Sequence, residues 1–160
     1  MRYLELARQH NWPEIVSVQN PYNLLNRTYE IGLAEIAHRE QVGLLAYSPL
    51  AFGVLSGKYL DGRADAKARL MLYKQFDRYT NGLAEQATRR YVDIARRANL
   101  DPAQMALAYI NQQAFTTANI IGATNMEQLQ TDIASVDIEL DRSVLDAIEE
   151  THKAIPNPCP

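Results

Sequence analysis

The sequence predicts an α/β chain made of parallel βα units that form part of a larger fold. Three short apolar runs, expected as strands, alternate with amphipathic segments expected as helices, which is typical of parallel sheets. Each run ends in a polar or glycine-containing turn, where ligands bind in open α/β sheets and in barrels. Three strands make a small parallel sheet, and a complete (β/α)8 barrel takes about 250 residues, whereas this chain has 160.

The individual elements follow from hydrophobic periodicity and from turn residues. Apolar residues recur at helical spacing in residues 2–10, 29–40, 83–98, 102–113 and 126–136 and in the stretch after Asp141. Apolar runs predict strands at residues 15–18, 42–47 and 118–121, and the first of these runs is largely β-branched. Residues 51–80 contain Gly53, Gly57 and Gly62 and are expected to form a long loop with at most short helices.

Length and composition indicate one globular domain over residues 1–160, with a mass of 18.1 kDa and a net charge of -3, and the small number of strands makes this domain incomplete. No basic excess points to nucleic-acid binding. Cys159 is the single cysteine, so no intrachain disulfide or cysteine-based metal cluster is expected, and no His or carboxylate cluster has metal-ligand spacing. No apolar run approaches the roughly 18 residues of a membrane span, and the N-terminus does not resemble a signal peptide. A cytoplasmic setting is therefore expected.

The end of the third predicted strand is the first candidate site. Gly122 allows a ligand to approach the backbone closely, and Thr124 or Asn125 can cap the following helix. The free N–H groups at such a helix start attract an anion, and a phosphate is the natural ligand. The alternative is an ordinary capped turn without a ligand.

The ends of the other two predicted strands are weaker candidates. Tyr47-Ser48-Pro49-Leu50 is followed by glycines, by Ser56 and by Lys58, which together could hold phosphate oxygens, although many loops have similar residues. Gln19 and Asn20 offer amide groups that could orient a polar ligand, or they serve the turn before Pro21.

Three stretches resemble the aldo/keto reductases. They are residues 15–23 (IVSVQNPYN), residues 45–58 (LAYSPLAFGVLSGK) and residues 120–129 (IIGATNMEQL). More narrowly, the chain is similar to the bacterial members akin to potassium-channel β subunits. This resemblance implies the C-terminal half of a (β/α)8 barrel, from the fifth helix to the end.

The resemblance also implies NADP(H) as the cofactor. Gln19 would bind the nicotinamide carboxamide, and Tyr47 would stack on the nicotinamide ring. The residues that would line the pyrophosphate or supply charge to it are Ser48, Pro49, Leu50, Gly53, Ser56, Lys58 and Arg69. Those that would hold the 2′-phosphate region are Gly122, Ala123, Thr124 and Gln128. Asp132 stands where the family usually has Asn near the adenine, and it brings a negative charge close to a phosphate.

In the family, the catalytic Asp, Tyr, Lys and His come from the N-terminal half of the barrel, and none has a counterpart in this chain. The expected function is therefore a truncated NADPH-dependent reductase that is inactive alone and takes a carbonyl substrate only with a complementing N-terminal half. The alternative is a non-enzymatic interaction module that pairs with itself or with a complementing half-barrel through exposed strand edges. A nucleotide-binding protein without turnover is a third hypothesis.

Overall fold

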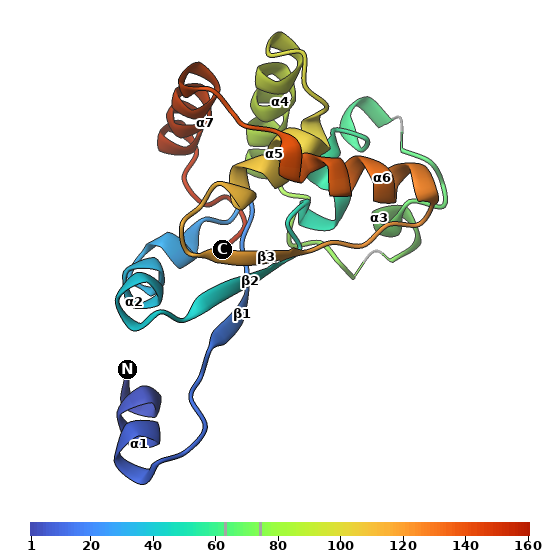
Figure 1. Ribbon diagram of the computed structural model, residues 1–160. Helices are drawn as coiled ribbons and strands as arrows, with labels where there is room; N and C mark the ends of the chain where they lie inside the picture. Colours follow the sequence, from blue (N-terminus) through green and yellow to red (C-terminus); the bar gives the residue numbers. More distant parts are fainter. Residues whose placement is uncertain (63, 74) are drawn as a thin grey trace.

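A parallel three-stranded sheet organises the computed structural model, which describes residues 1–62, 64–73 and 75–160. The strands are β1 (Ser17–Pro21), β2 (Gly43–Tyr47) and β3 (Thr116–Ile120), in the order β1-β2-β3 (Figure 1). β2 is central and pairs in parallel with both neighbours. The predicted succession of parallel βα units is therefore confirmed.

Seven α-helices accompany the sheet in the described residues. They are α1 (Arg2–His10), α2 (Leu33–Glu40), α3 (Arg69–Leu72), α4 (Gly82–Arg97), α5 (Pro102–Asn111), α6 (Met126–Ala134) and α7 (Arg142–Ala154). Short 3-10 helices are η1 (Thr28–Glu30), η2 (Ala51–Ser56), η3 (Leu60–Gly62) and η4 (Ser135–Asp137). Figure 1 shows α4, α5 and α7 gathered on one side of the sheet, while α1 stands apart from them.

Side-chain caps fix the starts of the last four helices, because each cap accepts a hydrogen bond from a backbone N–H of the first turn. The caps are Asn81, Asp101, Asn125 and Asp141. The predicted starts at Asp101-Pro102 and after Asp141 are confirmed, and of the two residues considered for α6 the structure selects Asn125.

Several predicted boundaries are wrong, because strand pairing and backbone geometry set them rather than apolar content; β1, for example, begins at Ser17 instead of residue 15. β1 extends to Pro21, which is the register partner of Tyr47, so β1 contains residues 19–20 instead of ending before them. β3 begins at Thr116, two residues before the apolar run. The helix expected from residue 29 begins at Leu33, after Gly32 with φ 86°.

The core lies between one face of the sheet and α5. Leu44 and Ala46 of β2 are fully buried on this face, whereas the alternate residue Tyr47 is only half-buried. Asn119 is the register partner of Ala46 and donates hydrogen bonds to the Leu107 carbonyl and to Asn111 Oδ1, both on α5. The face next to α5 is therefore filled, and the other face carries the partly exposed side chains.

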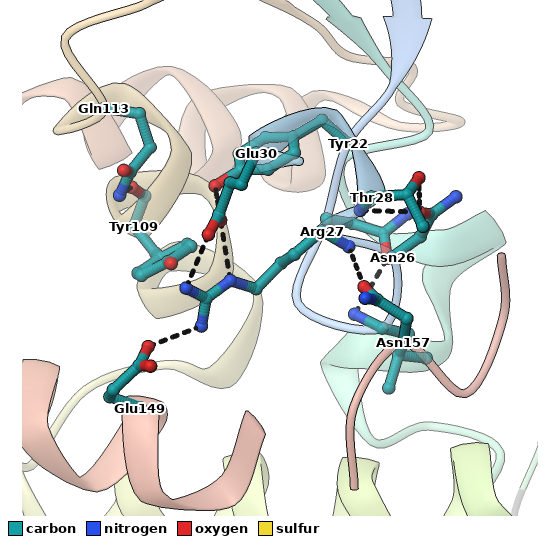
Figure 2. A network of polar contacts seen from close by, with 11 residues as sticks. Tyr22, Asn26, Arg27, Thr28, Glu30, Tyr109, Gln113, Glu149 and Asn157 are labelled. Atoms are coloured by element: carbon teal, nitrogen blue, oxygen red, sulfur yellow. Dashed lines mark hydrogen bonds and ion pairs between the residues drawn. The ribbon is translucent and has the colours of Figure 1, made fainter. Parts of the chain in front are cut away.

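An ionic cluster around the buried Arg27 ties the C-terminal helix and tail to the segment after β1 (Figure 2). The Arg27 side chain is 7% exposed, and it donates to Glu30 at 2.6 and 2.8 Å and to Glu149 of α7 at 2.9 Å. The guanidinium carbon also lies 5.4 Å from the ring centre of Tyr109. The Arg27 backbone N–H donates to Asn157 Oδ1 at 2.7 Å.

The same cluster keeps Glu30 ionised. Burial opposes its ionisation, but hydrogen bonds from Arg27 and from the Tyr22 hydroxyl lower the pKa of the Glu30 carboxyl below its ordinary value. A partly buried carboxylate needs such partners, since burial without them would favour its neutral form.

Candidate functional site

The carboxyl ends of the three strands form one edge of the sheet, as expected for a parallel arrangement. Pro21, Tyr47 and Ile120 are register partners across the sheet, so the segments that follow β2 and β3 leave from neighbouring positions. Gln19 pairs with Leu45 and lies within β1, two residues before that edge. Because side chains alternate along a strand, Gln19, Tyr47 and Ile120 share the face opposite the core.

The segment after β2 has an unusual backbone. Ser48, Ala51 and Phe52 adopt φ values of 53°, 49° and 58°, in the left-handed region that non-glycine residues rarely occupy. Such residues are costly, and they cluster at functional sites when their surroundings hold them in place. Here Asn23 Nδ2 donates to the Ser48 carbonyl at 3.0 Å, and Ser56 Oγ donates to the Gly53 carbonyl at 2.8 Å. The prediction that residues 51–80 contain at most short helices is confirmed here, because η2 and η3 are short 3-10 helices.

Two cations lie along this segment. A Cβ atom built at Gly53 would come within 2.7 Å of Lys58 Nζ, so the glycine allows the ammonium to approach the backbone. Lys58 Nζ lies 5.3 Å from the ring centre of Tyr59, and the Arg69 guanidinium carbon lies 5.6 Å from that of Phe52. Among the described residues, neither cation forms an ion pair with a carboxylate, so both can bind an anionic ligand.

The start of α6, which follows the neighbouring strand β3, carries the other group of predicted site residues. Thr124 donates through its backbone N–H and its hydroxyl to Gln128 Oε1, at 3.1 and 2.9 Å. Asn125 Oδ1 accepts from the Gln128 N–H at 2.9 Å. These residues and their neighbours Gly122 and Ala123 are exposed, so an anion can reach the N–H groups of the first turn.

The remaining predicted site residues are less accessible. Pro49 is buried, and Leu50 packs against the core. Asp132 is 6% exposed, in contrast to the exposed Gln128 one turn earlier. Burial, and after it the negative charge of Asp101, raises the pKa of the Asp132 carboxyl above its ordinary value.

Replacing Asp132 with Asn is expected to stabilise the chain at neutral pH. A raised pKa means that the folded chain binds a proton at Asp132 more tightly than the unfolded chain does, so this group costs stability as the pH rises through its folded-state pKa. Asp132→Asn should increase the free energy of unfolding at neutral pH by about 1 kcal/mol or less, and the gain should vanish in acid. Urea denaturation at both pH values measures this. An equal gain in acid would contradict the explanation.

The sequence analysis missed the Arg27 cluster. The only local signal is the spacing of Arg27 and Glu30, since residues three apart can pair on a helical turn. The other partner, Glu149, is 122 residues away along the chain, and no pattern connects it to Arg27.

Comparison with known proteins identifies the family. The model for the Aldo/keto reductase family matches residues 1–153, and the chain belongs to this family. Its α/β structure is accordingly part of a (β/α)8 barrel, as the sequence analysis expected. The described part of the chain contains no helix with the length and apolar character that a membrane crossing requires.

Several curated relatives share the whole chain or most of it. Protein tas of Escherichia coli (strain K12) is 52% identical over 160 residues, which are 100% of this chain and 46% of that protein. An aldo-keto reductase of Babesia bovis is 35% identical over 83% of this chain and 49% of its own length. The oxidoreductase YrpG of Bacillus subtilis (strain 168) is 31% identical over 87% of this chain and 41% of its own length. The chain thus spans about half the length of the curated relatives it matches.

Proposed function

We propose that this chain is the cofactor-binding, C-terminal half of an NADPH-dependent aldo/keto reductase, and that it lacks the groups that deliver the proton. The observation that carries the proposal is the carboxyl edge of the sheet, where the strained segment after β2 holds Lys58 and Arg69 without carboxylate partners among the described residues. Membership of the aldo/keto reductase family supports it.

The residues at this edge fit a dinucleotide with several phosphates. Lys58 and Arg69 would bind the phosphate oxygens, as cations on a glycine-containing loop commonly do. Thr124, Gln128 and the first turn of α6 would hold a second phosphate, and Tyr47 would offer a flat apolar surface to a ring. When bound, the cofactor supplies the hydride for reduction of a carbonyl group.

The proton for the developing alkoxide needs a separate donor. In the family, this donor and its partners come from the N-terminal half, and we assign the role to no residue of this chain. Tyr91 and Tyr109 are unsuited to it, because both are buried in the core and burial raises the pKa of each phenol above its ordinary value. We therefore expect bound cofactor without efficient turnover.

A second candidate is a non-enzymatic interaction module. It is favoured by the two strands β1 and β3, each of which pairs only with β2 in the part of the chain that the structure describes. Strand edges of this kind recruit further strands.

The proposed cofactor site is tested by titrating the 160-residue chain with NADPH and following the fluorescence of the nicotinamide. Lys58→Ala and Arg69→Ala are each expected to weaken binding about tenfold or more, since a hydrogen bond to a charged group contributes roughly 1.5–3 kcal/mol. Lys67→Ala is the matched control, because Lys67 is an exposed cation of the same loop outside the predicted site. No saturable binding, or equal weakening by all three substitutions, would contradict the assignment.

A further inference from the structure

We propose that Asn23 is a positioning residue for the cofactor site. From the segment after β1, its side chain holds the strained segment after β2 in the conformation that presents Lys58 and Arg69. Asn23 would touch no atom of the cofactor, because it acts through the Ser48 carbonyl. This inference rests on the proposed function and assigns a role to a residue outside the predicted site.

The Asn23 side chain reaches the segment after β2 from a fixed position. Asn23 is completely buried, and its backbone N–H and carbonyl both pair with Asn26, at 3.1 and 2.9 Å. Its Oδ1 accepts from the Leu25 N–H at 2.9 Å. These bonds fix the orientation of the side-chain amide, so that Nδ2 donates to the Ser48 carbonyl at 3.0 Å and to the Tyr79 hydroxyl at 3.3 Å.

The Ser48 carbonyl lies where the unusual conformation begins. Ser48 has a φ of 53°, and its carbonyl also accepts from the Ala51 N–H at 2.9 Å. Ala51 and Phe52 follow with φ values of 49° and 58°. None of these residue types favours the left-handed region, so a contact from outside the segment has to stabilise it. The hydrogen bond from Asn23 is such a contact, because it comes from a residue 25 positions earlier in the chain.

Both cations of the proposed site lie against residues of this segment. A Cβ atom at Gly53 would come within 2.7 Å of Lys58 Nζ, and the Arg69 guanidinium carbon lies 5.6 Å from the centre of the Phe52 ring. Phe52 and Gly53 are adjacent, and both have a positive φ. A change of backbone conformation at Ser48 would therefore move the surroundings of both cations at once, and a binding site loses affinity when its supporting residues are displaced.

Tyr79 provides a second connection between Asn23 and the cations. Tyr79 is buried, its hydroxyl accepts from Asn23 Nδ2, and its ring meets the Phe52 ring edge-on at 5.0 Å between ring centres. The other contact of the Phe52 ring is the Arg69 guanidinium described above. A continuous series of side-chain contacts thus leads from Asn23 to Arg69, in addition to the route through the Ser48 backbone.

The proposal is tested with Asn23→Ser in the 160-residue chain. Serine keeps an oxygen that can accept from the Leu25 N–H, but its side chain is too short to reach the Ser48 carbonyl. Asn26→Ser is the matched control, because Asn26 is 1% exposed and its Oδ1 accepts from the Thr28 N–H in the same way. The two variants therefore lose comparable local contacts, and only the first loses the bond to the segment after β2.

Two measurements separate positioning from a general loss of stability. In the cofactor-free chain, hydrogen exchange followed by NMR should become faster at the Ala51 and Gly53 N–H groups, which pair within the segment, in Asn23→Ser but not in the control. The affinity for NADPH should fall about fivefold in Asn23→Ser alone, because the cofactor binds only the molecules in which the segment is ordered. Urea denaturation should give similar stabilities for the two variants.

Tyr79→Phe is the second variant, and it decides the question if Asn23→Ser does not fold. It removes only the hydroxyl that Asn23 contacts and keeps the ring against Phe52, so both effects should be smaller, with NADPH affinity about twofold lower. Tyr91→Phe is its control, because Tyr91 is equally buried and its hydroxyl has no hydrogen-bond partner in the part of the chain that the structure describes. This control should leave NADPH affinity unchanged.

Unaltered exchange at Ala51 and Gly53 in Asn23→Ser would overturn the proposal, as would faster exchange with full NADPH affinity. An equal loss of affinity in Asn26→Ser would also overturn it, since the effect would then be a general one. Failure of the original chain to bind NADPH would contradict the proposed function instead. The exchange rates, which are measured without cofactor, would then still decide whether Asn23 holds the segment.

Discussion

Replacing Arg27 with methionine is expected to lower the free energy of unfolding by about 2–3 kcal/mol, because a hydrogen bond to a charged group contributes roughly 1.5–3 kcal/mol and the half-buried Glu30 carboxylate would lose its main donor. Methionine keeps most of the volume but none of the donors. Glu30, held by the guanidinium at 2.6 and 2.8 Å, would lose its strongest partner while staying largely out of water. Since domains are typically stable by about 5–15 kcal/mol, a large part of the total stability would be lost.

Urea denaturation followed by circular dichroism measures this effect. Arg39→Met is the matched control, because Arg39 forms an ion pair with Glu35 on the exposed side of α2, where its side chain is 73% exposed. Such helical surface pairs contribute about 0.3–0.5 kcal/mol. Similar losses in the two variants would show that the Arg27 cluster does not hold α7 and the tail to the segment after β1.

The sequence was sufficient for the order of the elements, because periodicity and caps are local signals. Asp101 before Pro102 defines the start of α5 without any knowledge of the fold. The limits of β1 and β3 were misplaced, because they depend on pairing with β2: the Gly43 N–H donates to the Val16 carbonyl, and Pro21 faces Tyr47. Neither contact can be read from apolar content.

The sequence was sufficient to predict which residues belong to the candidate site, but not the backbone conformation of the segment after β2. The motifs indicated Lys58, Thr124 and Gln128, and the structure places the two segments that carry them after neighbouring strand ends. The left-handed backbone at Ala51 and Phe52 could not be predicted, because neither residue type favours it. The contact that holds the start of this segment, the bond from Asn23 to the Ser48 carbonyl, joins residues 25 apart in the chain and leaves no local signal.

The second large effect concerns catalysis. With NADPH and an aromatic aldehyde such as a nitrobenzaldehyde, the 160-residue chain is expected to show no carbonyl reduction above the uncatalysed rate. The proposed site binds and orients the cofactor, but a positioned proton donor is worth about 10²–10⁴ in rate, and the alkoxide would also lack its stabilising hydrogen bonds.

The central claim is that this chain binds the cofactor but does not deliver the proton. Its most direct test is an assay of the purified chain with NADPH and the aldehyde, in which absorbance measures the oxidation of NADPH. We expect a rate equal to that of the reaction without protein, together with saturable NADPH binding in the fluorescence titration. A rate that saturates with aldehyde and falls in the Arg69→Ala variant would contradict the account, since the chain itself would then carry out the complete reduction.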